Sequence, residues 1–172
     1  MTTLDTPTST SLRAARCLTL PQPPPTTQIE NNDRSRVAAA MSPAQAVQVA
    51  ARAISRNALH PVCSPATGVA FHPRALLAVL TYCYASEVFS SDDIEDLMLR
   101  DANFRAFCGN QVPDARTLRR FRRYNREAIE TCLSAVLRAL AEQSGTHPTD
   151  AEVFEQAHRK LANAVLMDMP EI

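Results

Sequence analysis

The sequence predicts an all-α fold, a multi-helix bundle that follows a disordered N-terminal tail. Its 172 residues include only three Gly, and they contain no Asn-Gly or Asp-Gly pair of the kind that closes a β-hairpin. The apolar fraction is 45%, which is enough for a core. Because Trp is absent, that core must consist mainly of Ala, Leu, Val and Ile. From residue 41 onward the apolar residues recur at three- and four-residue spacing, which is typical of helices.

The first 40 residues differ in composition from the rest of the chain. Residues 1–40 are rich in Thr, Ser and Pro and show no apolar periodicity before Val37. Such a segment buries too little apolar surface to offset the entropy that is lost on ordering. We therefore expect residues 1–40 to be a disordered tail and residues 41–172 to form one helical domain.

Two helices are expected at the start of this domain. Ser42 followed by Pro43 is typical of an N-cap and a first helical residue. The first helix is predicted to continue to about Leu59, before a proline-containing loop that reaches Phe71. The second helix is predicted to begin at Pro73, and it is apolar nearly all round, so it belongs at the centre of the bundle. Its apolar residues are Leu76, Leu77, Val79, Leu80, Tyr82, Cys83 and Tyr84.

A short acidic helix and a connector are expected next. The pair Ser90-Ser91 precedes two aspartates, which indicates an N-cap with acids in the first turn, where the helix dipole favours them. The helix is predicted over residues 92–100. Asn103 is expected to cap a short turn after it, and Gly109 is expected to end that turn in the left-handed conformation.

The C-terminal third of the chain predicts two more helices. One is expected over residues 115–143, with Asp114 or Thr117 as its N-cap. Thr149 and Glu152 form a capping box for the last helix. The apolar face of that last helix is expected to consist of Phe154, Ala157, Leu161 and Val165.

The predicted 115–143 helix begins with an unusually basic segment. Residues 116–126 read RTLRRFRRYNR, which is six arginines in eleven positions without an Asp or Glu. At 3.6 residues per turn the arginines fall within an arc of about 160°, and Leu118, Phe121 and Ile129 lie on the opposite side. A helix that buries one face and presents guanidinium groups on the other suits a polyanion, and nucleic acid is the obvious candidate.

The charge of the whole chain does not point to a partner. There are 18 basic and 18 acidic residues, and the formal net charge is zero. The distribution is uneven, however, because residues 87–101 contain six acids against one Arg. This acidic segment is the alternative partner for the arginines, since a neighbouring acidic helix would pair with them and mask them.

The order of the elements is that of a helix-turn-helix core. A short helix is followed by a connector that ends in Gly109, and then by a helix whose N-terminal half is basic. The connector is longer than the usual three or four residues, so the match to the simple motif is loose.

The stretch from Phe71 to about Arg126 resembles the N-terminal domain of bacterial DDE insertion-sequence transposases of the InsH type. The most specific part is the block Pro-Asp-x-x-Thr-Leu-x-x-Phe-Arg-Arg, which runs from Pro113 to Arg123. Two departures from the resemblance stand out: the chain has Glu87 where relatives usually carry Gly, and its 92–100 helix is acidic where theirs is usually basic. The other matching residues are Phe71-His72-Pro73-Arg74, Leu76-Leu77, Tyr82, Tyr84, Ser90-Ser91, Ile94-Glu95, Phe104-Arg105 and Cys108-Gly109.

The resemblance implies a module that recognises the terminal inverted repeats of a mobile element. In that family a downstream ribonuclease-H-like domain cuts and joins strands with three carboxylates and divalent metal. The sequence ends at Ile172, before such a domain would fit. We therefore expect double-stranded DNA as partner and no catalysis, cofactor or metal site in this chain. A separate catalytic transposase chain, a homodimer and a cytoplasmic, nucleoid-associated location without a membrane contact are further expectations.

The DNA-binding residues are expected on the basic helix. Four arginines early on the helix are expected to reach base edges: Arg116, Arg119, Arg120 and Arg123. Arg122 and Arg126 are expected to hold phosphates, while Thr117 is a better helix cap than base reader. The alternative is a helical protein–protein interaction module whose Arg-rich face meets an acidic partner. The candidate set is Arg116, Thr117, Arg119, Arg120, Arg122, Arg123 and Arg126.

Other residues favour structural roles. Tyr82 and Tyr84 are typical stacking residues for single strands, but their place in the most apolar helix favours core packing. A nucleophile built from Cys63 and His60 lacks a third, orienting group. The cysteines stand at least twenty residues apart without a CxxC pair, so they indicate no zinc site.

Overall fold

A computed structural model describes residues 41–169, and all of its regular elements are helices. Within those residues the only β pairing is an isolated bridge between Cys63 and Ala70. The all-α prediction is confirmed, whereas the predicted tail at residues 1–40 lies outside the described residues. The elements are α1 (Pro43–Ala53), η2 (Arg56–Ala58), α2 (Pro73–Ala85), α3 (Ser91–Arg100), α4 (Ala102–Arg105), η3 (Ala106–Cys108), α5 (Ala115–Tyr124), α6 (Arg126–Gln143) and α7 (Asp150–Met167).

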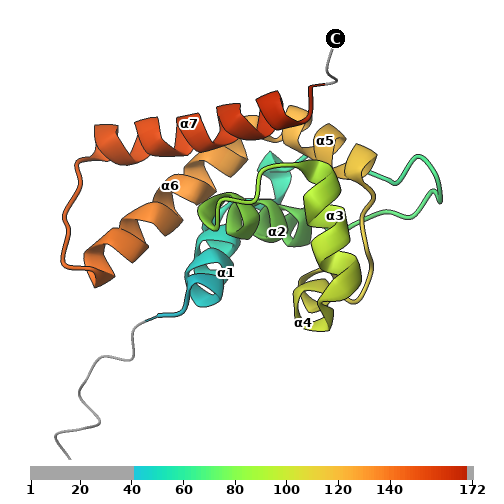
Figure 1. Ribbon diagram of the computed structural model, residues 1–172, viewed down its shortest axis with the longest axis horizontal. Helices are drawn as coiled ribbons and strands as arrows, with labels where there is room; N and C mark the ends of the chain where they lie inside the picture. The colour runs from blue at the N-terminus through green and yellow to red at the C-terminus, as the bar shows by residue number, and fades with distance from the viewer. Residues whose placement is uncertain (1–40, 170–172) are drawn as a thin grey trace, which may run out of the picture. The chain divides into compact units, whose positions relative to one another are not determined.

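Helix α2 is the centre of the bundle, as its apolar sequence predicts. It contacts α1, α5, α6, α7 and η3, and it lies inside the ring of helices in Figure 1. Tyr82 packs against Phe104 and Phe107, with ring centroids 5.6 and 6.0 Å away, which confirms its packing role. The fully buried side chains of α2 include Leu76, Leu77, Val79, Leu80, Cys83 and Tyr84.

Helices α6 and α7 form an antiparallel pair along one side of the bundle (Figure 1). The Thr149 hydroxyl accepts a hydrogen bond from the Glu152 N–H at 3.3 Å, and the Glu152 carboxylate accepts one from the Thr149 N–H at 2.8 Å. The predicted capping box is therefore confirmed. The predicted apolar face is only partly right, because Phe154 is 54% exposed and Val165 is 38% exposed. Ala157 and Leu161 are buried as predicted, whereas at the two ends of the face Val153 and Ala164 are buried instead of their neighbours.

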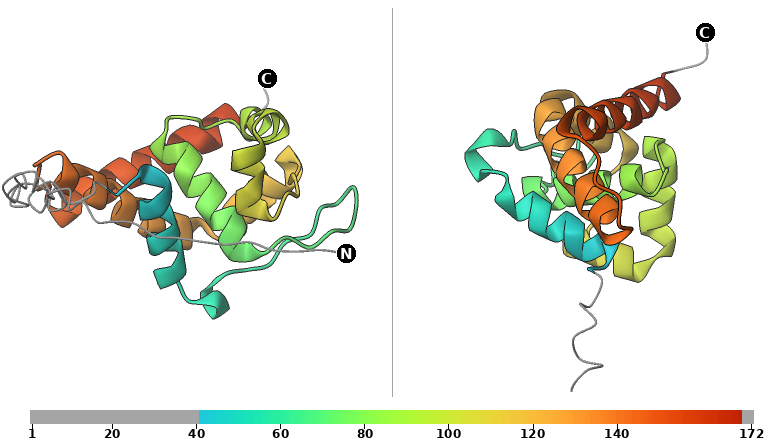
Figure 2. Two further views of the ribbon diagram at one scale, coloured as in Figure 1. Left: turned by 90° about the horizontal axis from the view of Figure 1, so that it is seen from below. Right: turned by 90° about the vertical axis from the view of Figure 1, so that its left-hand side faces the viewer.

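Helix α1 begins at the predicted N-cap but ends earlier than predicted. The Ser42 hydroxyl caps α1, and Ala53 is its last residue, whereas the pattern predicted a helix to about Leu59. Ile54 leaves the helix in an extended conformation, and its carbonyl accepts a hydrogen bond from the Arg74 guanidinium at 2.9 Å. Helix α1 therefore ends where a tertiary hydrogen bond binds the carbonyl of the next residue. The tip of the next loop, residues 60–72, projects beyond the helices in Figure 2, whereas Val62 and Phe71 near its two ends are buried in the core.

The short helix after α3 begins earlier than predicted. Helix α4 starts at Ala102, so Asn103 lies inside it and not at its cap. The Asp101 carboxylate accepts a hydrogen bond from the Phe104 N–H at 3.3 Å. Gly109 ends η3 with φ 62° and ψ 37°, which confirms the predicted left-handed position. The acidic helix α3 begins as predicted, with the Ser90 hydroxyl accepting from the Asp93 N–H.

The predicted 115–143 helix is in fact two helices that meet at Asn125. The backbone of Asn125 has φ −121° and ψ 28°, outside the helical region. Its buried side chain accepts a hydrogen bond from the His60 N–H at 2.7 Å and donates to the His60 carbonyl at 3.1 Å. It also donates to the Phe121 carbonyl at 3.0 Å. No Gly or Pro marks this break, so apolar periodicity could not reveal it.

We expect Asn125→Ala to lower the free energy of unfolding by about 2–3 kcal/mol, because it leaves both backbone groups of His60 without their side-chain partner. Urea unfolding followed by circular dichroism measures the change. The control is Asn57→Ala, at an exposed position of η2, with an expected change within about 0.5 kcal/mol. Equal effects of the two substitutions would contradict the role of Asn125.

None of the helices in residues 41–169 has the combination of length and hydropathy that a bilayer crossing requires.

Candidate nucleic-acid interface

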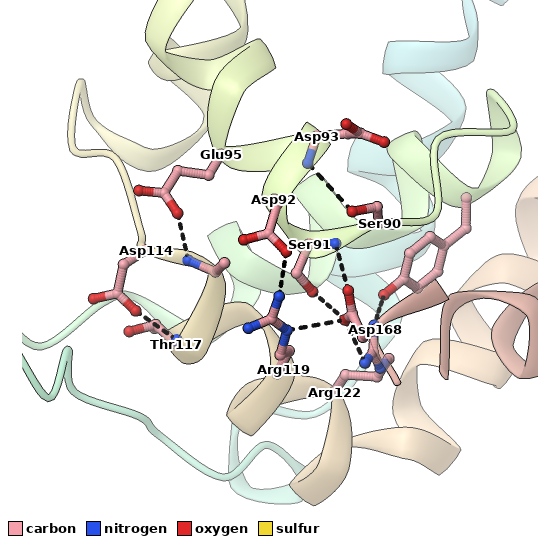
Figure 3. Close-up of polar contacts among 12 residues, drawn as sticks. Ser90, Ser91, Asp92, Asp93, Glu95, Asp114, Thr117, Arg119, Arg122 and Asp168 are labelled. Carbon is pink, nitrogen blue, oxygen red and sulfur yellow. Dashed lines mark hydrogen bonds and ion pairs between the residues drawn. The ribbon is translucent and has the colours of Figure 1, made fainter. Parts of the chain in front are cut away.

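Helix α5 carries most of the basic segment, and two carboxylates cap its N-terminal end. The Asp114 side chain accepts a hydrogen bond from the Thr117 N–H at 2.7 Å, so Asp114 is the N-cap, one of the two predicted. The Glu95 carboxylate, from α3, accepts a hydrogen bond from the Ala115 N–H at 2.7 Å. Figure 3 shows both contacts. The positive end of the helix dipole is therefore already satisfied by acids of the chain.

The loop between η2 and α2 holds α5 at both of its ends. The Ser64 hydroxyl donates a hydrogen bond to the Asp114 carboxylate at 2.5 Å. At the other end, Asn125 binds the backbone of His60. These contacts join segments that are about fifty or more residues apart in the sequence. They fix the direction in which the side chains of α5 point.

Three arginines of α5 point directly away from the bundle, and we call them the arginine stripe: Arg116, Arg120 and Arg123. Their spacing of four and three residues places them in one row, opposite the buried Leu118 and Phe121. All three are exposed. None of the ion pairs between described residues involves them. The stripe is therefore a row of positive charge without an ion pair, although the charge of Arg116 contributes to the lowered pKa of the neighbouring Asp114.

Arg126, the first residue of α6, is also exposed, but it is paired. Its Nε lies 3.4 Å from Glu130 Oε1, one turn further along α6. Its charge is therefore partly compensated within its own helix.

Arg122 does not lie on the exposed face, which corrects the prediction that it holds a phosphate. The residue is 7% exposed. Its Nη2 lies 2.6 Å from Asp168 Oδ2, and its Nη1 donates to the Tyr84 hydroxyl at 3.2 Å. The arc of arginines was too wide to stay on one exposed face, because α5 packs against α2, α3 and α6. Arg122 is therefore part of the core.

Arg119 lies between the buried and the exposed face of α5. Its guanidinium is paired with Asp92 of α3, and its Nε lies 3.6 Å from Asp168 Oδ2 (Figure 3). One arginine is thus bridged to the acidic helix, as the alternative interpretation expected. The bridge involves one arginine of the segment and leaves the arginine stripe open.

Thr117, the remaining candidate, is fully buried. It lies in the first turn of α5 and its N–H is bound to Asp114. This position agrees with the prediction that Thr117 belongs to the start of the helix and does not read bases. Its burial excludes a direct contact between its side chain and a base edge.

The comparison with known families decides what this helical unit is. Residues 33–124 match the family described as Transposase domain (DUF772), which is more than half of the chain. The chain belongs to this transposase-domain family. The predicted relation to transposase N-terminal domains is confirmed, and the InsH type stays a prediction. No curated protein and no solved structure matches the chain.

The matched part of the transposase domain ends at Tyr124, the last residue of α5. Helices α6 and α7 lie beyond it, yet α7 supplies the counter-ion of α5. Asp168, at the end of α7, accepts hydrogen bonds from the Ser91 N–H at 2.9 Å and from the Ser91 hydroxyl at 2.5 Å. The same carboxylate pairs with Arg122 (Figure 3).

Sequence reasoning missed Asp168 altogether. A carboxylate at the C-terminal end of a helix opposes the helix dipole, and that unfavourable position was the only available signal. Burial by itself would raise the pKa of Asp168, but the hydrogen bonds from Ser91 and the pairing with Arg122 outweigh it and lower the pKa below the ordinary 3.8.

The lowered pKa of Asp168 predicts a loss of stability in acid. A depressed folded-state pKa contributes stability that is present above the unfolded-state pKa of about 4 and is lost as pH falls through the folded-state value. Between pH 6 and pH 3, the free energy of unfolding in urea should fall more for the wild type than for Asp168→Asn. The variant keeps part of this pH dependence, because the pKa of Asp114 is also lowered. An identical loss in both proteins would contradict the assignment.

The cysteines and potential metal ligands of the described residues form no second site. Cys83, Cys108 and Cys132 are buried, and burial raises their pKa values, that of Cys108 to about 11. They are packing residues. Residues 41–169 contain no group of three or more His, Cys, Asp or Glu that is arranged to hold a metal ion.

Proposed function

We propose that this transposase-family chain binds double-stranded DNA, with α5 as the helix that contacts it. The observation that carries the proposal is the arginine stripe, three exposed arginines in one row without an ion pair among the described residues. Arginine suits this role because its planar fork matches both phosphate oxygens and the edge of guanine. The family adds that the chain is related to transposition.

Helices α3 and α5 would act as the two helices of a helix-turn-helix unit. They pack against each other, and Glu95 of α3 binds the first N–H of α5. In such units the second helix enters the major groove with its N-terminal half. Arg116 and Arg120 lie in that half of α5 and are placed for base edges and the phosphates that flank them. Arg123 is placed for a phosphate, while Arg126 stays paired with Glu130.

The proposed target is the terminal inverted repeat of an insertion element, by resemblance to transposase N-terminal domains. In that arrangement the chain recognises DNA, and a separate catalytic transposase chain performs the strand chemistry. A homodimer would match two repeated half-sites. The location that follows is the cytoplasm, with the chain associated with the nucleoid.

A second candidate is the protein–protein interaction module. The bridge between Arg119 and Asp92 favours it, because an acidic surface already pairs with one arginine of the segment. The salt dependence of binding distinguishes the two candidates. An acidic protein surface and a DNA backbone both attract the arginine stripe, but only DNA releases condensed counterions in proportion to the number of contacts.

The test is a fluorescence-anisotropy titration of labelled duplex DNA at several salt concentrations. Three phosphate contacts predict a slope of about −2.7 in a plot of log affinity against log salt, which is a fall of about 40-fold between 50 and 200 mM. An affinity that does not change with salt would reject the proposal. Preference for one duplex sequence over a scrambled control would support recognition of a specific repeat.

A further inference from the structure

The end of α7 lies in a groove that the arginines of α5 and α6 line. The groove has a volume of about 430 Å³. It contains four guanidinium groups and one carboxylate, that of Asp168. The lining residues are Arg119, Arg122, Arg123, Arg126, Leu161, Val165, Asp168 and Met169. Through Arg123 the groove is continuous with the arginine stripe.

We propose that Asp168 is an autoinhibitory contact: it holds Arg119 and Arg122 back from DNA and so limits how many phosphates the domain can engage. The inference rests on the proposed DNA-binding function. Asp168 pairs with Arg122 at 2.6 Å and lies 3.6 Å from the Nε of Arg119. Both arginines line the groove beside the stripe, and the largely buried Arg122 would turn out of the core through this groove to reach a DNA backbone that follows α5.

The last turn of α7 has little else to hold it in place. Ala164 is the last buried apolar residue of this helix. After it come Leu166, which is 64% exposed, and Met169, which is 62% exposed. The polar contacts of Asp168 with Ser91 and the two arginines are therefore the main attachment of this end. Opening of this end therefore displaces no fully buried apolar side chain of α7 beyond Ala164, although it exposes the buried pair of Asp168 with Arg122.

The inference also explains why so basic a helix occurs in a chain without net charge. Asp92 and Asp168 together compensate Arg119 and Arg122. The arginines of α5 without an ion pair among the described residues are thereby reduced to the stripe. Release of Asp168 would free Arg122 and leave Arg119 paired with Asp92 alone.

The test compares Asp168→Asn with Asp93→Asn in the same anisotropy titration. Asp93 is exposed on α3 and forms no ion pair among the described residues, so its substitution adds the same charge without releasing an arginine. We expect Asp168→Asn to bind duplex DNA about tenfold more tightly at 50 mM salt, with a slope steeper by about 0.9, because Arg122 is released while Arg119 stays paired with Asp92. The fall between 50 and 200 mM salt then grows from about 40-fold to about 150-fold. Asp93→Asn should leave the slope unchanged.

A purely structural role of Asp168 predicts the opposite sign, because a loosened α5 would bind DNA less well. A slope that is unchanged or shallower in Asp168→Asn, or equally steep in Asp93→Asn, would overturn the inference. If Asp168→Asn does not fold, Ser91→Ala decides, since the Ser91 hydroxyl donates a hydrogen bond to Asp168 and its loss weakens the hold on that carboxylate. A steeper slope is expected, and an unchanged slope would overturn the inference. Loss of salt-dependent binding in the wild type would instead reject the proposed function itself.

Discussion

Arg122→Ala is expected to lower the free energy of unfolding by about 3–5 kcal/mol, which makes it the most destabilising single substitution considered. The side chains of Arg122 and Asp168 are 8% and 3% exposed. Removing one partner of such a buried pair leaves the other charge without compensation in a poorly hydrated place. The Tyr84 hydroxyl loses its partner as well. Urea unfolding at pH 7 measures the effect.

The neighbouring Arg123→Ala is the matched control, because it removes the same side chain from the exposed face. Its effect should stay within about 0.5 kcal/mol. The double variant Arg122→Met with Asp168→Asn should recover at least half of the lost stability, since no unpaired buried charge remains. Equal effects of Arg122→Ala and Arg123→Ala would show that Arg122 has no special role.

Replacing the whole arginine stripe is expected to have the largest effect on DNA affinity. The triple variant Arg116→Ala, Arg120→Ala and Arg123→Ala should bind duplex DNA about two to three orders of magnitude more weakly at 50 mM salt. The slope of log affinity against log salt should fall by about 2.7 in magnitude. Anisotropy titration measures both quantities, and a melting curve confirms that the variant is folded.

A charge-matched triple variant controls for the loss of three positive charges. Arg52, Arg100 and Arg159 are exposed on α1, α3 and α7, away from α5. Replacing them with Ala changes the net charge equally. We expect the control to keep most of the affinity and nearly all of the slope. If the two triple variants lost affinity to the same extent, a general charge effect would replace the proposed interface.

The sequence predicted those parts of the fold that are encoded locally. N-caps such as Ser90 and Thr149 act through residues three positions away, so they are visible in a short window. The central place of α2 followed from an apolar composition all round the helix. The order of helices around the basic segment followed from the same local signals, and so did the resemblance that the family match confirmed in part.

The site was only partly predictable, because its decisive contacts join distant segments. Asp168 binds Ser91, which is 77 residues earlier in the chain. Asn125 binds His60 across 65 residues and divides one predicted helix into two. A helical-wheel argument places six arginines on one side, but it cannot show that α7 covers part of that side. Burial of Arg122 therefore had no signal in the basic segment itself.

The most direct test of the central claim is an NMR titration that follows the arginine Nε–Hε signals while duplex DNA is added. We expect the signals of Arg116, Arg120 and Arg123 to shift and broaden, while that of Arg159, which is exposed on α7, stays in place. Signals that move equally for all exposed arginines, or changes confined to residues away from α5, would contradict the claim that the outward row of α5 meets the DNA.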